Sequence, residues 1–174
     1  IHFGQTSPDV TGHPGSRTTS FILPGNNISS ADFSGSVKTD HWYVIQGIDV
    51  KASKNSKAVA ILGNSITDGR GSGTNKQNRW PDILSAKLLA NESTKNIGVL
   101  NLGIGGNCVV RGGLGPTALE RFDRDILSQS NVRWLIILEL FLAALLAVRW
   151  LDDGSIAVFA PAAGVVEGER QPAP

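Results

Sequence analysis

Residues 58–69 read Ala58-Val-Ala-Ile-Leu-Gly63-Asn-Ser65-Ile-Thr-Asp-Gly69, and this stretch decides the fold class. The unbroken apolar run 58–62 is typical of a strand that is buried on both faces, as in a parallel sheet. The run stops at Gly63, and Ser65 follows in a polar turn bounded by glycines. Ligands bind at the carboxyl edge of open α/β sheets, so Ser65 is a candidate functional residue. The competing interpretation is an ordinary loop serine. A bare Gly-x-Ser after a strand has roughly one chance in ten of being catalytic.

The residues around Ser65 form one of two motifs that point to a known family. Residues 63–69, Gly-Asn-Ser-Ile-Thr-Asp-Gly, resemble the first signature block of the GDSL, or SGNH, ester hydrolases, which usually reads Gly-Asp-Ser-hydrophobic-Thr-Asp-Gly. The second block appears as residues 101–107, Asn-Leu-Gly-Ile-Gly-Gly-Asn, after another apolar strand. Two blocks at the right separation, each after a strand, are much harder to obtain by chance than one.

Three shorter motifs extend the resemblance to a secreted subgroup of that family. These motifs are Arg79-Trp-Pro-Asp82, Gly112-Gly-Leu-Gly115 and Arg121-Phe-Asp-Arg-Asp125. The resemblance runs from about residue 3 to Glu139. It implies an α/β fold, a flavodoxin-like SGNH three-layer sandwich. Residues 57–139 would be the N-terminal half of that hydrolase domain, preceded by a β-rich segment.

The resemblance also implies a serine ester hydrolase that acts on acyl or acetyl esters, with acetylated carbohydrate and lipid as candidate substrates. Ser65 would be the nucleophile, and it needs a base because a serine hydroxyl is a weak nucleophile. The backbone N–H groups of Ser65 and Gly106 would stabilise the oxyanion, and glycine suits the second position because it allows close approach. Asn64, Asp68 and Asn107 would lie near the site.

The sequence departs from the family at the third and fourth blocks. The third block, Gly-x-Asn-Asp, should follow Glu139, but the chain continues Leu-Phe-Leu-Ala, so the oxyanion asparagine falls at Leu142. The fourth block, Asp-x-x-His, is absent, because all three histidines (His2, His13 and His41) precede Ser65. Asn64 also replaces the usual aspartate, and we expect this change to disturb the hydrogen bonds of the turn.

The missing groups predict little or no turnover for this chain. Losing one oxyanion donor costs about 10²–10³-fold in rate. Disabling the triad leaves only about 10³–10⁴-fold over water. No metal and no organic cofactor is implied by the mechanism.

Composition excludes several other classes. The formal net charge of +1 shows no preference for nucleic acid or an anionic membrane, and no stretch has the 18 or so apolar residues of a membrane span. The single cysteine, Cys108, excludes an intramolecular disulfide and a zinc framework, and we expect it to be a small buried residue. No signal peptide is visible, so an extracellular location is implied by the family alone.

Residues 1–50 predict β-structure without helical periodicity, and the resemblance implies the C-terminal part of a β-rich module. The segments 17–23 and 41–48 are rich in β-formers and bounded by turn residues. His13 and Arg17 are candidates for a substrate cleft, although structural turn residues are about three times likelier by the general behaviour of loops. The short polar stretch 51–56 marks the domain boundary.

From Lys57 onward strands alternate with helices, which predicts a parallel sheet flanked by helices. We expect strands at 57–62, 97–102 and 132–138. A first helix should carry Trp80, Ile83, Leu84 and Leu88 at helical spacing, with Pro81 in its first turn. A second amphipathic helix should carry Leu119, Phe122 and Ile126, with Arg121, Asp123 and Arg124 on its solvated side.

The tail, residues 140–174, no longer resembles the family. Its Leu/Ala/Val run predicts an apolar helix, and residues 161–174 have the composition of a disordered segment. The abrupt loss of resemblance, the absence of methionine and the start at Ile1 suggest an incomplete gene product, from a retained intron, a frameshift or a mispredicted gene end.

Two alternatives to an ester hydrolase remain. One is a non-catalytic product of such a gene, a truncated or mis-spliced fragment without enzymatic function. The other is a nucleotide binder, suggested by the glycines of 69–73 and 103–106, but neither stretch has the Gly-x-Gly-x-x-Gly or Walker spacing.

Overall fold

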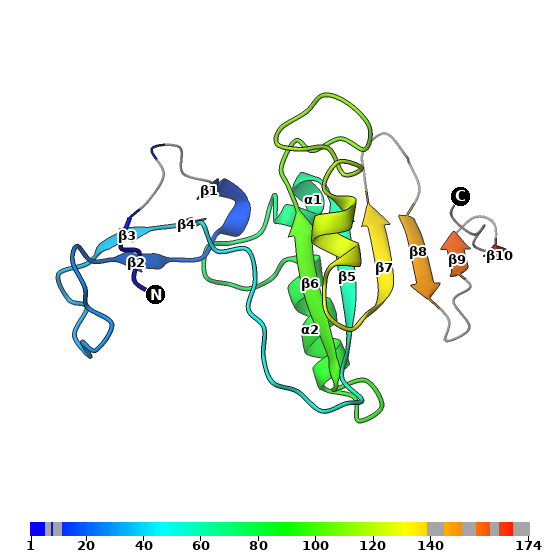
Figure 1. Ribbon diagram of the computed structural model, residues 1–174, viewed down its shortest axis with the longest axis horizontal. Helices are drawn as coiled ribbons and strands as arrows, with labels where there is room; N and C mark the ends of the chain where they lie inside the picture. The colour runs from blue at the N-terminus through cyan, green and yellow to red at the C-terminus, as the bar shows by residue number, and fades with distance from the viewer. Residues whose placement is uncertain (6–7, 9–11, 139–144, 151–155, 161–163, 169–174) are drawn as a thin grey trace.

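The computed structural model describes residues 1–5, 8, 12–138, 145–150, 156–160 and 164–168. In these residues a six-stranded sheet, flanked by helices, lies beside a smaller β-rich N-terminal part (Figure 1). The sheet has the strand order β10-β9-β8-β7-β5-β6. Its bounds are β5 (Lys57–Gly63), β6 (Ile97–Gly103), β7 (Val132–Leu138), β8 (Leu145–Trp150), β9 (Ile156–Ala160) and β10 (Gly164–Gly168).

Three parallel strands form the part of the sheet that was predicted. β5 lies between β6 and β7 and pairs in parallel with both, with Gly63 opposite Gly103 on one side and Leu138 on the other. The order β6-β5-β7 is the 2-1-3 arrangement that begins a flavodoxin-like sheet. The expectation of an α/β fold with a parallel sheet is therefore confirmed, and all three strands lie where the apolar runs predicted.

The tail differs from its prediction, because the sheet continues through it. β8 pairs antiparallel with β7, and β9 and β10 follow in antiparallel order. The Leu/Ala/Val run therefore contributes a strand at 145–150 instead of an apolar helix, and residues 164–168 are a strand where disorder was expected. Pairing with β8 satisfies the backbone groups along the outer edge of β7, which a sheet edge otherwise leaves open. Residues 161–163 and 169–174 lie outside the described part.

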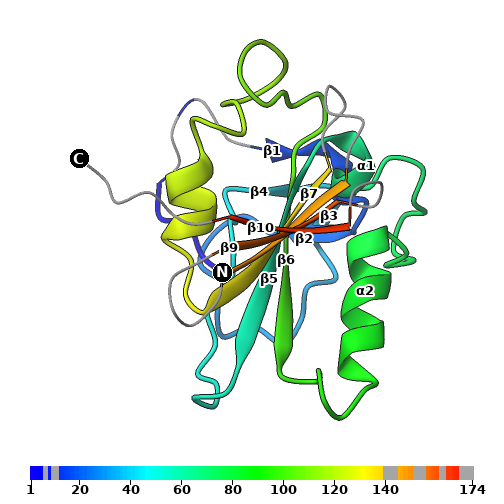
Figure 2. The same cartoon turned by 90° about the vertical axis from the view of Figure 1, so that its right-hand side faces the viewer.

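Helices cover both faces of the parallel strands. α2 (Trp80–Leu89) and the single π-helical turn η2 (Asp123–Leu127) lie on opposite faces (Figure 2). α2 begins as predicted, with Pro81 in its first turn and a capping box between Arg79 and Asp82, whose carboxylate accepts the Arg79 N–H at 3.0 Å. Ile83 is exposed, so the buried stripe of this helix is narrower than the periodicity suggested.

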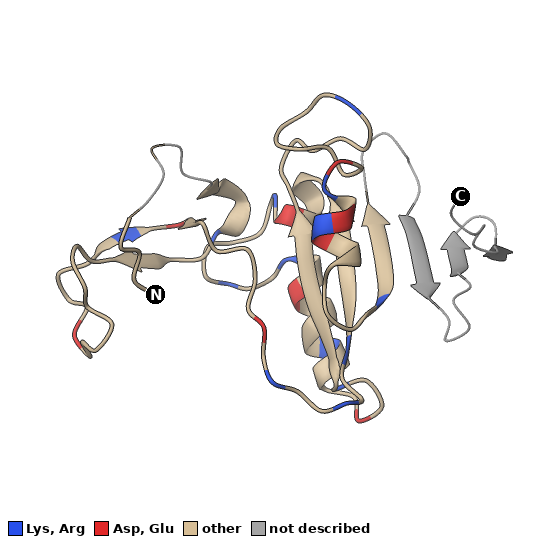
Figure 3. Cartoon of the chain, viewed as in Figure 1, with Lys and Arg blue, Asp and Glu red and all other residues tan. Residues whose placement is uncertain are grey.

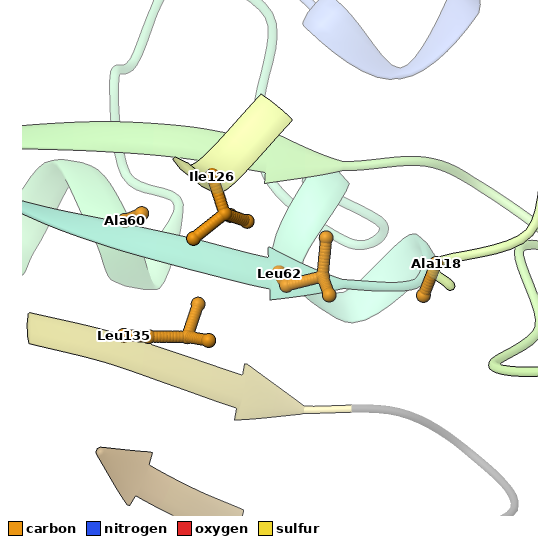
Figure 4. Close-up of a cluster of buried hydrophobic side chains, with 5 residues drawn as sticks. All are labelled: Ala60, Leu62, Ala118, Ile126 and Leu135. Carbon is orange, nitrogen blue, oxygen red and sulfur yellow. The ribbon is translucent and has the colours of Figure 1, made fainter. Parts of the chain in front are cut away.

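The main core cluster lies between the sheet and η2 (Figure 4). Its buried members are Ala60, Leu62, Ala118, Ile126 and Leu135. Because strand residues alternate between faces, Ala60 and Leu62 share the η2 face, whereas Val59 and Ile61 point to the face that α2 covers. Both sets are buried, as the unbroken apolar run predicted.

The second predicted helix is wrong in two respects. It is a short π-helical turn, and Arg121, expected on the solvated side, is 1% exposed. Leu119, expected on the apolar side, is 66% exposed. Residues 118–121 are a turn that precedes η2, and the regular helix that the spacing of Leu119, Phe122 and Ile126 predicted does not extend through them.

The N-terminal part consists of two small antiparallel sheets. β1 (Gly12–His13) pairs with β4 (Trp42–Tyr43), and β2 (Ser20–Ile22) pairs with β3 (Val37–Thr39). A 3-10 turn, η1 (Pro14–Ser16), follows β1 directly. The expected β-structure is confirmed in part, because within the predicted segments 17–23 and 41–48 only residues 20–22 and 42–43 are strands.

Charged residues of both signs are spread over the described part of the chain, and both signs meet on η2 (Figure 3). None of the helices described is long and apolar enough to cross a membrane.

Candidate active site

The candidate site is built at the carboxyl edge of the parallel strands. Gly63 ends β5, and Ser65 begins the one-turn helix α1 (Ser65–Asp68), where it is half-buried. A Cβ atom at Gly63 would overlap the Thr67 side chain, and one at Gly103 would overlap the α1 backbone. Glycines at both strand ends therefore allow α1 to lie directly over them.

Asn64 holds the turn that presents Ser65. Its side chain is buried and Oδ1 accepts a hydrogen bond of 3.0 Å from the Ile66 N–H, so Asn64 is the N-cap of α1. An aspartate would accept the same bond. The replacement of the family's usual aspartate therefore keeps the turn's hydrogen bond, contrary to the expected disturbance.

Three hydrogen bonds join the two signature blocks. The Ile104 N–H donates to the Gly63 carbonyl at 2.9 Å. The Asn101 side-chain amide donates to the Thr67 carbonyl at 2.9 Å. The Gly105 N–H donates to Asp68 Oδ2 at 3.1 Å. Ser65 and the turn that contains Gly106 are therefore held at the same edge of the sheet.

Gly106 lies in a tight turn after β6. The Asn107 N–H donates to the Ile104 carbonyl at 3.0 Å, and Gly106, with φ of +75°, is the third residue of this turn. A positive φ at that position is the requirement of a type II turn, which glycine meets without strain. A Cβ at Gly106 would also lie 3.0 Å from Leu114 Cδ1. Both observations explain a glycine at this position.

Asn107 is committed to hydrogen bonds within the loop. Its side-chain amide donates to the carbonyls of Leu114 and Pro116 at 3.0 and 2.8 Å, and its Oδ1 accepts from Arg121 Nη2 at 3.0 Å. Asn107 therefore shapes the glycine-rich loop 108–116 behind the site. The hydrogen bond between Asn107 and Arg121 is one of the contacts of the buried Arg121 side chain. Arg121 Nη1 also donates to the Leu102 carbonyl at 2.8 Å.

Asp125 balances the buried guanidinium. Its Oδ2 lies 3.1 Å from Arg121 Nη1, and its Oδ1 accepts from Arg124 Nε at 2.7 Å. Burial raises the pKa of the Asp125 carboxyl, but the hydrogen bonds and charges of Arg124 and Arg121 outweigh it and hold the pKa below its usual range. Asp125 is therefore ionised at neutral pH and pairs with Arg121.

Asp68 is the carboxylate closest in sequence to Ser65, and it faces the N-terminal part of the chain. Its Oδ1 lies 3.2 Å from His13 Nδ1, which forms an ion pair when the imidazole is protonated, and Oδ1 has no hydrogen-bond partner among the described residues. Burial raises the pKa of this carboxyl above its usual range, opposed by the His13 charge, the Gly105 N–H, and the charges of Arg79 and Arg17.

The remaining candidate residues are Leu142, the two other histidines and Cys108. Leu142, at the position of the family's oxyanion asparagine, lies outside the described residues. His41 is half-buried in the N-terminal part, where no described residue bonds to its Nδ1, and His2 is exposed. Cys108 is half-buried, where we had expected full burial. No cluster that could hold a metal ion occurs among the described residues.

Sequence reasoning named Asn101, Arg121, His13 and Asp68 but missed their contacts: the Asn101–Thr67 hydrogen bond, the burial of Arg121 and the His13–Asp68 pair. Arg121 and Asp125 are spaced four residues apart, the spacing of an ion pair on a helix, and that signal was available. His13 and Asp68 are distant in sequence, and no pattern connects them.

Comparison with protein families gives one match. Residues 59–140 match the family described as GDSL-like Lipase/Acylhydrolase. This range contains both signature blocks and ends within one residue of the point where the resemblance was seen to stop. No curated protein matches the chain.

Proposed function

This chain carries a GDSL-like lipase/acylhydrolase domain at residues 59–140, and we propose that Ser65 is its nucleophile in the hydrolysis of an acyl or acetyl ester. The observation that carries the proposal is the joining of the two blocks. The Ile104 N–H bonds to the Gly63 carbonyl at 2.9 Å, so Ser65 and Gly106 lie on adjacent parallel strand ends. The carboxyl edge of such a sheet is where open α/β folds bind ligands.

The mechanism begins with attack of Ser65 Oγ on the ester carbonyl carbon. The carbonyl oxygen gains negative charge and would accept hydrogen bonds from the backbone N–H groups of Ser65 and Gly106. Ser65 is the first residue of α1, so its N–H has no partner within that helix. The proton of the hydroxyl must pass to a base, which returns it to the alcohol as the tetrahedral intermediate collapses and the C–O bond of the ester breaks. The acyl group then remains on Ser65 Oγ until water attacks it and releases the carboxylic acid and the free serine.

In the family that base is the histidine of an Asp-x-x-His block after the nucleophile, and these 174 residues contain no such block. Without a triad, catalysis falls to about 10³–10⁴-fold over water. We therefore infer that this chain, by itself, has very low turnover, although the proposed nucleophile and the two proposed oxyanion donors lie at the same edge of the sheet.

The alternative is a chain with no enzymatic function, and one observation favours it. The position of the third oxyanion donor is occupied by Leu142, whose side chain has no N–H to donate. A polypeptide that lacks this donor and the base would retain only the fold of the domain.

The substrate and the location belong to the proposal as well. Leu114 is exposed and lies beside Gly106, so apolar surface adjoins the oxyanion position, which suits the acyl part of an ester. Acetylated carbohydrate and lipid esters both fit this chemistry. An extracellular location is supported by the resemblance to the secreted subgroup.

Chemical rescue tests the nucleophile assignment. The purified chain is incubated with a fluorophosphonate at increasing imidazole concentrations, and the labelled residue is identified by peptide mass. We expect labelling at Ser65 whose rate rises with imidazole, because imidazole replaces the missing base, and no labelling of Ser65→Ala. Labelling that persists in Ser65→Ala, or a folded chain that stays unlabelled at every imidazole concentration, would refute the assignment.

A further inference from the structure

We propose that His13, in the N-terminal β-rich part, is a positioning residue for the oxyanion turn, acting through Asp68 on Gly105. The catalytic meaning of this contact rests on the proposed role of Gly106, whereas the contact itself is a property of the fold.

The chain of contacts runs across the boundary between the two parts of the molecule. His13 Nδ1 lies 3.2 Å from Asp68 Oδ1, and Asp68 Oδ2 accepts the Gly105 N–H at 3.1 Å. Gly105 directly precedes Gly106. The position of the Asp68 carboxylate therefore affects the position of the peptide group that presents the second oxyanion donor.

The carboxylate is enclosed on several sides. A Cβ at Gly15 would overlap the Asp68 carboxylate, and one at Gly105 would lie 3.0 Å from Oδ2. The side chain of Asp68 is 10% exposed, so little water reaches it. Since Oδ1 has no hydrogen bond among the described residues, the imidazole of His13 is its nearest source of positive charge.

His13 is itself held in place. Its ring lies 5.0 Å from the ring of Trp42, centre to centre, and the backbone pairing of His13 with Trp42 fixes both residues. The N-terminal part is anchored to the loop after α1 by Arg79 Nη1, which donates to the Ser16 carbonyl at 2.9 Å, and by the Asn75 N–H, which donates to the Arg17 carbonyl at 2.9 Å.

The contacts from His13 through Asp68 to Gly105 predict that the Gly105 amide depends on pH in a specific way. Histidine gains its charge between about pH 8 and 5, a range in which arginine does not change. The other charged groups that act on Asp68 are Arg79 and Arg17, and both stay protonated. Asp68 itself has a pKa that burial raises, so a change at Gly105 reports the His13 charge only where it follows the His13 ring signals and is lost in a variant without the imidazole.

The test is an NMR pH titration of the ¹⁵N-labelled chain. In the parent, we expect the Gly105 amide shift to inflect at the same pH as the His13 ring signals. In His13→Gln, the inflection at that pH should disappear, and any change that remains should follow the Asp68 carboxyl, whose pKa rises further when the His13 charge is removed. In His13→Lys, which keeps a cation at every pH, Gly105 should stay near its low-pH value. His2→Gln, at an exposed histidine, should retain the parent inflection.

Hydrogen exchange supplies the second readout. We expect His13→Gln to raise the exchange rate of the Gly105 amide at low pH about tenfold, the change expected when a charge-assisted hydrogen bond is weakened. Exchange of the core amide of Ala60 reports global stability and should not change.

The proposal fails if Gly105 shows no inflection at the pH of the His13 ring signals in the parent, or if an inflection at that same pH persists in His13→Gln. If His13→Gln does not fold, the parent titration still decides, because a Gly105 shift that does not change where the His13 ring signals change would exclude the coupling. Failure of Ser65 to react with the fluorophosphonate leaves these NMR results untouched, so the two proposals fail separately.

Discussion

The backbone N–H of Ile104 donates a hydrogen bond of 2.9 Å to the carbonyl of Gly63, and this bond joins the last residue of β5 to the turn after β6. Ser65 follows Gly63 by two residues, and Gly106 follows Ile104 by two. The bond therefore sets the relative position of the proposed nucleophile and an oxyanion donor.

Gly106→Ala tests the oxyanion turn. The φ of +75° costs an alanine about 1–2 kcal/mol of stability. The added Cβ also meets Leu114, which displaces the turn. We expect the imidazole-dependent labelling of Ser65 to slow by up to about 10²–10³-fold, the effect of losing one oxyanion donor.

Gly112→Ala is the matched control for that variant. Gly112 has φ of +77°, and a Cβ there would meet nothing within 4 Å. It should lose similar stability in urea unfolding while Ser65 labelling stays at the parent rate. Equal labelling rates for the two variants would remove Gly106 from the oxyanion site.

Asn64→Ala removes the N-cap of α1. Loss of the bond to the Ile66 N–H should cost about 0.5–2 kcal/mol, measured by urea unfolding. Asn64→Asp keeps an acceptor oxygen at the same place and should retain more stability than Asn64→Ala. An aspartate variant as unstable as the alanine variant would show that the Asn64 side chain contributes through its amide group instead.

Arg121→Met should be strongly destabilising. It leaves Asn107 Oδ1 and the Leu102 carbonyl without their donor, and unsatisfied buried groups cost about 1–3 kcal/mol each. The control is Arg124→Met, because Arg124 bonds to the same Asp125 from an exposed position and should change stability by about 0.5 kcal/mol or less. Equal losses in the two variants would contradict the structural role of Arg121.

The lowered pKa of Asp125 predicts that the folded chain loses stability in acid. Arg124 and Arg121 hold its pKa in the folded chain below the unfolded value of about 3.9. The folded chain then binds fewer protons than the unfolded chain, so the stabilisation is complete above about pH 4 and is lost as the pH falls through the folded-state pKa.

The measurement for this prediction is the urea midpoint between about pH 6 and 3. Asp125→Asn should lower the midpoint at neutral pH and flatten its dependence in acid. Asp123→Asn, which changes an exposed carboxylate of the same turn, should leave the acid dependence in place. A parent-like acid slope in Asp125→Asn would assign the loss to another group.

The parallel strands and the site glycines were predictable from the sequence. An apolar run such as 58–62 is typical of a strand in a sheet that is covered on both sides. The prediction of such a strand therefore depends little on distant residues. Gly63 and Gly103 end their strands as the two signature blocks indicated. The family match then confirmed the identity of the segment that contains both blocks.

The strands of the tail were not predictable in the same way. A Leu/Ala/Val run is compatible with a helix or a strand, and its length alone does not decide. The outcome depends on the open edge of β7, to which β8 pairs. That edge is a tertiary feature, and no local pattern in residues 145–150 indicates it.

Arg121 and His13 illustrate a second limit. A charged residue beside apolar residues at helical spacing is usually solvated. Arg121 is buried because Asn107 Oδ1 and the Leu102 carbonyl accept its hydrogen bonds and the Asp125 carboxylate pairs with its charge. His13 resembled a turn residue, and its contact with Asp68 exists because two distant segments pack together. Side-chain partners of this kind follow from the fold.

The most direct test of the central claim, that these 174 residues hold Ser65 as a nucleophile without its base, is intact-mass measurement after fluorophosphonate treatment without imidazole. We predict that the folded parent stays unlabelled during a time that fully labels an active serine hydrolase. Stoichiometric labelling of the parent that is absent in Ser65→Ala would contradict the claim, because it would show that Ser65 is already activated within this chain.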